Sequence, residues 1–108
     1  MLKIDSDNNI TLTRGDTLTL TLELTKDGEA YTPLEDDAIR FALAKGYAGA
    51  PGYELIAEAT VENMTIVLPA EQTTLDYGTY NYDVQITHGD GSVDTFISAS
   101  LKIIGEVA

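Results

Sequence analysis

A run of strict alternation from Thr17 to Thr25 constrains the fold more than any other part of the sequence. Leucine occupies every second position, and threonine or glutamate fills the positions between. A period of two buries one face and exposes the other to water, as in a β-strand. In a helix the same leucines would spread around the circumference. The sequence therefore predicts a strand over residues 17–25 with its leucines in a core.

Other alternating or apolar runs of strand length recur at intervals of about 8–12 residues, which is typical of a β-sandwich. In the run 38–44, Ile39, Phe41 and Leu43 are predicted to face inward. The alanines and glutamates of residues 54–61 also suit a helix, but their position between strands favours a strand. The remaining predicted strands cover residues 10–13, 64–68, 79–87, 92–97 and 99–104.

Turn signals separate these runs. Lys26–Glu29 contains the Asp-Gly pair of a tight hairpin, and residues 89–91 form a second hairpin. Residues 46–52 hold three glycines and a proline and predict a loop. Residues 69–75 predict one short helical turn, because Pro69 has a preset φ and Glu71 lies near the positive end of the turn.

The strand at residues 79–87 is preceded by Asp76 and Gly78 in the pattern Asp-x-Gly-x-Tyr. This pattern resembles the tyrosine corner of immunoglobulin-type sandwiches, in which the phenol hydrogen-bonds back to the backbone. We expect Tyr80 and Tyr82 to be buried, and the Tyr80 hydroxyl to bond to the backbone of residues 71–76. An antibody domain has a disulfide cysteine at the position of Tyr82, whose bulk is expected to fill that space.

These features predict an all-β fold, an immunoglobulin-like antiparallel β-sandwich of about 7–9 strands. With 108 residues, the chain is expected to form a single domain over residues 1–108. It has no cysteine, which excludes disulfides, thiolate metal sites and cysteine catalysis.

The charge is strongly acidic, with 18 Asp and Glu against 6 Lys and Arg and a net charge of −12. Phosphate backbones and anionic membranes would repel such a chain, so neither nucleic acid nor membrane is an expected partner. The charge serves solubility, or it steers the chain toward a basic partner. No signal peptide or membrane-spanning stretch is recognisable, so we expect a cytoplasmic chain or one exported by assembly into something larger.

Candidate chemical sites are weak. His88, close to Ser92, lies at a predicted hairpin tip, where a solvated turn histidine is expected rather than a catalytic triad. Asp5 and Asp7 offer oxygen ligands at alternate positions, but the following spacing fails the pattern of a calcium loop, which leaves at most a weak calcium site. The sequence predicts no catalytic, cofactor-binding or metal-ligating residue.

Three further groups of residues have a structural interpretation beside a functional one. Residues 14–16 spell Arg-Gly-Asp, a cell-adhesion tripeptide that is also good turn chemistry. Glu35, Asp36 and Asp37 are expected to form a solvated turn. Four tyrosines in loops or at strand ends are expected to cap the core, or else to offer platforms for carbohydrate or protein: Tyr31, Tyr47, Tyr53 and Tyr77.

Several strings of the chain resemble small prophage proteins of Gram-positive gut bacteria. They are residues 11–17, 26–33, 39–43, 77–86 and 89–96, and the likeness spans residues 4–104. These proteins are similar to the N-terminal immunoglobulin-like domain of phage baseplate upper proteins. The resemblance implies a non-enzymatic structural or assembly role in a phage or prophage tail or baseplate, located in the virion or in the bacterial cytoplasm during assembly. It implies contacts with other virion proteins and with copies of itself, and no active site. The alternative is a cell-surface or carbohydrate-binding immunoglobulin-like module.

Overall fold

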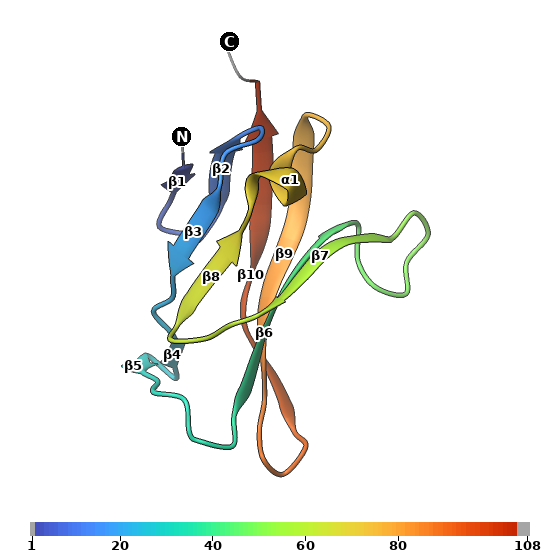
Figure 1. Cartoon of the computed structure of the whole chain (residues 1–108). Coiled ribbons are helices and arrows are strands. Elements are labelled where there is room, and N and C mark those ends of the chain that lie inside the picture. The colour runs from blue at the N-terminus through green and yellow to red at the C-terminus, as the bar shows by residue number, and fades with distance from the viewer. Residues whose placement is uncertain (1, 106–108) are drawn as a thin grey trace.

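The computed structural model describes residues 2–105 and has an all-β architecture with one short helix (Figure 1). The ends of the predicted domain, Met1 and residues 106–108, lie outside the described residues. Within that part of the chain the elements are β1 (Leu2–Ile4), β2 (Ile10–Thr13), β3 (Leu18–Thr21), β4 (Thr25–Lys26), β5 (Glu29–Ala30), β6 (Ala38–Lys45), β7 (Glu54–Thr60), β8 (Thr65–Leu68), α1 (Ala70–Thr73), β9 (Gly78–Thr87) and β10 (Val93–Ile104).

Six strands form the larger sheet, in the order β1-β2-β10-β9-β6-β7. Neighbours are antiparallel except β2 and β10, which run parallel with Leu101 opposite Ile10. This parallel pair joins the beginning of the fold to its last strand, as the adjacent blue and red arrows in Figure 1 show. Because β7 and β1 end the sheet, each has a backbone edge that no strand of the described chain covers.

A smaller sheet, β3 paired antiparallel with β8, lies across the larger one as a second layer (Figure 1). The core fills the space between the layers. It is built from alternate residues of both sheets, including Leu18, Leu20, Ile66 and Leu68 from the smaller one. Opposite them lie Phe41, Leu43 and other inward residues of the larger sheet: Ile10, Leu12, Val84, Ile86, Leu101 and Ile103. The period-2 pattern thus places its apolar residues in one contiguous core.

The predicted burial of the leucine run is confirmed, since Leu18, Leu20, Leu22 and Leu24 are all buried. The single strand predicted over residues 17–25 is wrong, because β3 ends at Thr21 and β4 begins at Thr25. Beyond Thr21 the backbone changes partner: the Leu22 amide donates to the carbonyl of Met64, and the Leu24 carbonyl accepts from Tyr31. Leu22 and Leu24 therefore stay buried although the hydrogen-bond ladder of β3 ends before them.

The two strands predicted at residues 92–97 and 99–104 are one strand, β10. Its register against β9 shifts between Thr95 and Ile97, so Phe96 is an extra residue in a β-bulge. A bulge reverses which side chains face inward, and this makes one long strand read as two in the sequence. Residues 54–61 do form a strand, as predicted, in β7.

The short helical turn is confirmed as α1, which follows Pro69 and carries Glu71 in its first turn. The predicted hairpin at Lys26–Glu29 is also present between β4 and β5. Asp27 and Gly28 both have positive φ there, at 54° and 82°, the backbone shape of the tight turn that Asp-Gly favours.

Candidate functional site

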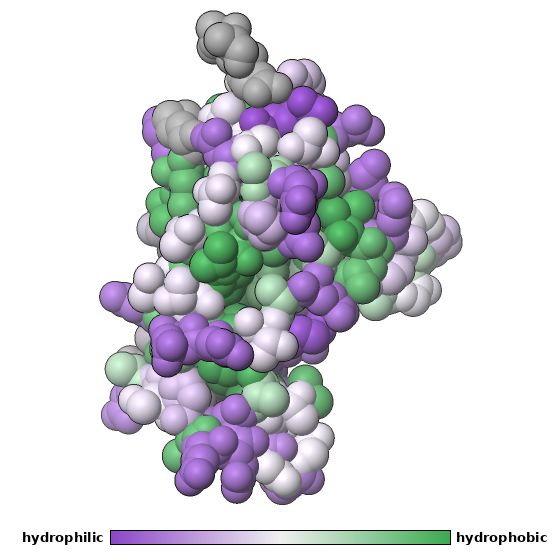
Figure 2. Space-filling model, in the orientation of Figure 1, coloured by the Kyte–Doolittle hydropathy of each residue, from purple (hydrophilic) through white to green (hydrophobic). Residues whose placement is uncertain are grey.

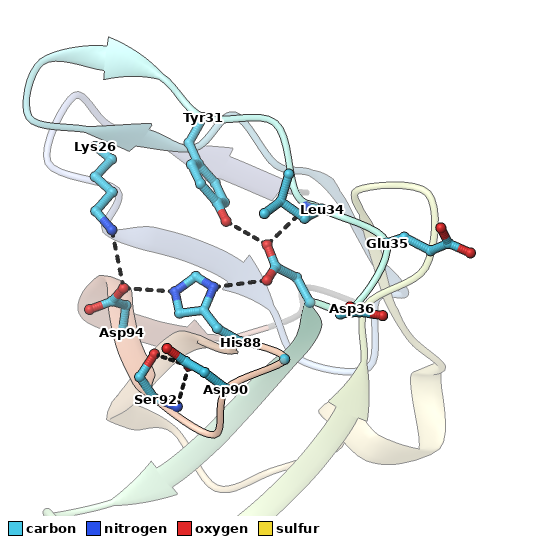
Figure 3. A pocket seen from close by; sticks show the side chains of 11 residues that line it. Lys26, Tyr31, Leu34, Glu35, Asp36, His88, Asp90, Ser92 and Asp94 are labelled. Carbon is cyan, nitrogen blue, oxygen red and sulfur yellow. Dashed lines mark hydrogen bonds and ion pairs between the residues drawn. The ribbon is translucent and has the colours of Figure 1, made fainter.

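The end of the sandwich opposite α1 holds a cluster of charged side chains around His88 (Figure 3). Its Nδ1 lies 2.8 Å from Oδ1 of Asp37, and its Nε2 lies 2.8 Å from Oδ2 of Asp94. Because ionised carboxylates only accept hydrogen bonds, this geometry suits the protonated ring, in which both nitrogens donate. His88 thereby connects three separate segments: the start of β6, the β9–β10 hairpin and β10 itself.

Asp37 is the buried anchor of this cluster, with a side chain only 1% exposed. Besides His88, its carboxylate accepts hydrogen bonds from the Tyr31 hydroxyl and from the Leu34 amide at 2.9 Å. These donors, the Tyr31 hydroxyl first among them, lower the pKa of Asp37 to about 2. The same hydrogen bond holds the phenol proton and raises the pKa of Tyr31 to about 12.

The second carboxylate, Asp94, lies nearer the solvent and also receives Lys26 Nζ at 3.4 Å. Its hydrogen bond to His88, followed by the charge of Lys26, lowers the pKa of Asp94. In return, the hydrogen bonds to Asp94 and then Asp37 raise the pKa of His88. Each charge in the cluster is therefore stabilised by a neighbour of opposite sign.

Two expectations are corrected here. His88 is not a solvated turn histidine, because its side chain is only 18% exposed and bonded at both nitrogens. Asp37 is not part of a wet turn, whereas Glu35 and Asp36 beside it are exposed. Asp37 and His88, which contact each other, are 51 residues apart in the sequence. Since they meet only when β6 pairs with β9, no local pattern indicates the contact.

This arrangement fastens the end of the fold and does not assemble a nucleophile with a base. Ser92 Oγ donates to Asp90 Oδ1 at 2.6 Å rather than to His88. Both nitrogens of His88 lie 2.8 Å from carboxylate oxygens, so neither is directed at the Ser92 hydroxyl. The adjoining depression, of about 760 Å³, is lined by these residues together with Leu34, Glu35, Asp36 and Gly89.

The corner residues lie where the sequence places them. The Tyr80 hydroxyl donates to the carbonyl of Asp76 at 2.8 Å, within the expected stretch, and Tyr80 and Tyr82 are both buried. Gly78, with φ of 145°, opens the strand in a conformation that favours glycine. Tyr82 packs on Phe41 with ring centroids 5.6 Å apart, and its hydroxyl donates to the carbonyl of Asn8. Besides the predicted filling of space by its ring, Tyr82 thus makes a hydrogen bond.

The side chains of the polar segments 5–9 and 14–16 make hydrogen bonds with the backbone. Asp5 Oδ1 accepts from the amides of Asp7 and Asn9 at 2.9 and 3.0 Å, which closes a turn. Among residues 2–105, no three His, Asp or Glu side chains gather in a way that could hold a metal ion. In the Arg-Gly-Asp turn, Arg14 Nε donates to the Leu75 carbonyl and the Asp16 carbonyl accepts from Thr73. This turn is tied to the segment around α1.

The loop tyrosines divide into one that packs and three that are exposed. Tyr31 lies in the His88 cluster and against Phe96, with ring centroids 4.9 Å apart. Tyr47, Tyr53 and Tyr77 are 65%, 40% and 64% exposed, so the prediction that they cap the core is wrong for these three.

Tyr47 and Tyr53 belong to the loop between β6 and β7, which projects from the body of the molecule in Figure 1. They border a shallow groove of about 150 Å³ on the outer face of the larger sheet. Polar side chains form part of its lining, and Arg40 there donates to Gln85 at 2.6 Å and pairs with Glu58 at 3.3 Å. The other polar lining residues include Asn81, Asp83 and Ser98.

Comparison with protein-family models and with curated proteins found no match to this chain. Among the residues the structure describes, no helix is long and apolar enough to cross a membrane.

Proposed function

We propose that this chain is a non-enzymatic structural or assembly protein of a phage or prophage tail or baseplate, acting through protein–protein contacts. The observation that carries the contact role is the projecting β6–β7 loop. From Gly46 to Tyr53 it has no charged residue, although the chain carries a net charge of −12. Exposed tyrosines in a glycine-rich loop give a large contact area at low entropic cost, as in antibody loops.

The strand order supports an immunoglobulin-type sandwich. In that fold the C, F and G strands are neighbours in one sheet, and B lies beside E in the other. Here β6, β9 and β10 are neighbours, and β3 pairs with β8. The corner tyrosine at the start of β9 corresponds to the one that precedes an F strand. A sandwich of this kind presents loops and edges to partners, and many unrelated functions use it. The tail assignment itself rests on the resemblance of the sequence.

Detection of the chain in phage particles tests this proposal. Particles from a strain that encodes the chain are expected to contain it at a stoichiometric level by quantitative mass spectrometry. Replacement of the chain by a Tyr47→Ser, Tyr53→Ser variant should reduce its incorporation at least several-fold, because the contact rings are lost. Tyr77→Ser, at a tyrosine outside the loop that is as exposed as Tyr47, is the control and should be incorporated normally. Absence of the chain from particles would contradict the tail assignment.

A carbohydrate-binding module is the second candidate, favoured by the groove beside Tyr47 and Tyr53. Two exposed rings next to Arg40, Asn81 and Asp83 offer stacking together with polar contacts to hydroxyl groups. A glycan array followed by calorimetry tests it. Binding that is lost in Asn81→Ala but retained in Tyr77→Ser would support this candidate, and an array without hits would remove it.

A further inference from the structure

The smaller sheet ends at a strand, β8, whose outer edge has no partner among residues 2–105. In Figure 1, β3 lies on one side of β8, and no strand lies beside it on the other side in that layer. The larger sheet has six strands and the smaller has two, so the smaller sheet covers only part of the larger one. Figure 2 shows hydrophobic residues reaching the surface on this face of the molecule.

The hydrogen-bonding register leaves backbone groups of β8 available. The Leu22 amide donates to the Met64 carbonyl at 2.7 Å, and this pairing continues through Ile66 opposite Leu20. Pairs that exchange hydrogen bonds alternate with pairs that do not, so the N–H and C=O of Val67 point away from β3. Val67 also lines a groove of about 310 Å³, together with Thr60, Glu62, Asn63 and Thr65.

The side chain of Val67 is 54% exposed at this open edge. Proteins usually protect such edges with charges, proline or bulges. β7 follows that rule with Glu54 and Glu58, whereas β8 contains no charge between Thr65 and Leu68. Along β3 the outward-facing side chains are Thr19 and Thr21. Of the two strands in the smaller sheet, β8 is thus the one that combines an open edge with an exposed aliphatic side chain.

We propose that β8 accepts an extended, basic segment of a partner protein as an additional antiparallel or parallel strand. This inference rests on the proposed assembly role and names a surface for it. Main-chain hydrogen bonds to Val67 would supply affinity, and alternate apolar side chains would pack beside its isopropyl group.

The acidic charge of this chain favours a basic segment as the one that binds at β8. Between residues 46 and 101 the chain has eight acidic residues and no Lys or Arg. Of these acids, Glu62 lines the groove itself. A second copy pairing through β8 would bring two such segments, and two chains of net charge −12, against each other. A segment with lysine or arginine would instead find Glu62 in the groove.

Titration of the isotopically labelled protein with a synthetic peptide that alternates valine and lysine tests the proposal by NMR. The amide signals of Glu62, Thr65 and Val67 are expected to shift and saturate, and the Val67 amide should gain protection from hydrogen exchange. A peptide alternating valine and glutamate should not bind. Glu62→Gln should weaken binding about threefold at low salt, whereas Glu71→Gln on α1 serves as the matched control and should not.

Val67→Lys should abolish binding while the fold stays intact, because the side chain is exposed and the rest of the spectrum reports the fold. Absence of shifts at millimolar peptide, shifts confined to β7 or to the β6–β7 loop, or equal binding of the acidic peptide would each overturn the proposal. Concentration-dependent shifts at β8 without peptide would identify a second copy as the occupant and overturn it as well. The particle experiment tests the tail assignment separately, so the two failures are distinguishable.

Discussion

At the scale of single residues, His88 shows how a neighbour outside the local sequence decides the state of a side chain. Its two nitrogens contact Asp37 and Asp94 at equal distances of 2.8 Å. The Tyr31 hydroxyl and Lys26 complete the cluster from a further segment, residues 26–31. Because one ring connects three segments, its protonation state is coupled to the order of that end of the fold.

Replacement of His88 by glutamine should cost more stability at acidic than at alkaline pH. The folded protein raises the pKa of His88 above its ordinary value of 6.5, so it binds the proton more tightly than the unfolded chain does. That stabilisation is complete below the unfolded pKa and disappears as the pH rises through the folded pKa. Urea unfolding of both proteins at about pH 6 and about pH 9 measures the difference.

The chain has one histidine, so its ring signals in NMR report this pKa directly. The Asp37→Asn, Asp94→Asn variant is the control and should return the pKa to about 6.5. If His88→Gln lowered the free energy of unfolding equally at both pH values, this would contradict a charged interaction of His88 with Asp37 and Asp94. Asp37 acts in the opposite range: with a pKa of about 2, it stabilises the fold above its ordinary pKa of 3.8 and ceases to do so as the pH falls through 2.

At the scale of elements, short segments owe their conformation to contacts with other segments. α1 has only four residues, too few to be stable alone. Thr73 on α1 is 1% exposed, and its hydroxyl lies 2.6 Å from the carbonyl of Asp16 and 3.1 Å from that of Ala70. The Gly15 amide also donates to the Thr73 carbonyl. These bonds join α1 to the turn between β2 and β3.

Thr73→Val should therefore destabilise the protein by about 1–3 kcal/mol, because it keeps the side-chain shape but removes the donor to the partly buried carbonyl of Asp16. A lower urea midpoint with an unchanged slope measures the loss. The matched control is Thr74→Val, whose hydroxyl is bonded to the Ala70 carbonyl at an exposed position and should cost less than about 0.5 kcal/mol. Equal effects of the two substitutions would show that the bond to Asp16 contributes nothing.

At the scale of the whole molecule, charge opposes the compact state. A net charge of −12 repels itself within a small sandwich, and the ion pairs of Lys26 and Arg40, within residues 2–105, are largely exposed to solvent. The His88 cluster engages Asp37 and Asp94, and Arg40 on the outer face engages Glu58 and Asp83.

Sodium chloride should therefore raise the thermal midpoint by a few degrees between about 0.01 M and about 1 M, as the screening length falls from about 30 Å to about 3 Å. Differential scanning calorimetry measures this shift. The Glu23→Lys, Glu35→Lys variant changes two exposed positions and takes the net charge from −12 to −8, since each exchange adds two units. Its midpoint should depend less on salt. A wild-type midpoint that falls with salt would mean that ion pairs outweigh the net repulsion.

Across these scales, what the sequence could predict was what depends on near neighbours in the chain. The alternation of Leu18 with Leu20 fixes which face is buried, and the Asp-Gly pair at residues 27–28 specifies its own turn. The tyrosine at residue 80 reaches back only four residues to Asp76. Each of these features is a property of a short segment, so composition and spacing suffice to predict it.

The tertiary structure decided everything that depends on which segments meet. Tertiary contacts determine that β3 ends at Thr21 and that β10 has a bulge at Phe96. They also place His88, which the sequence predicts to be solvated, against Asp37. The tertiary structure also left Tyr47 exposed on a projecting loop and Val67 on an open edge. Period-2 patterning states that a strand has an inner face but not which strand lies beside it. Pairing depends on backbone hydrogen bonds, which are the same for every residue, and on contacts between distant segments.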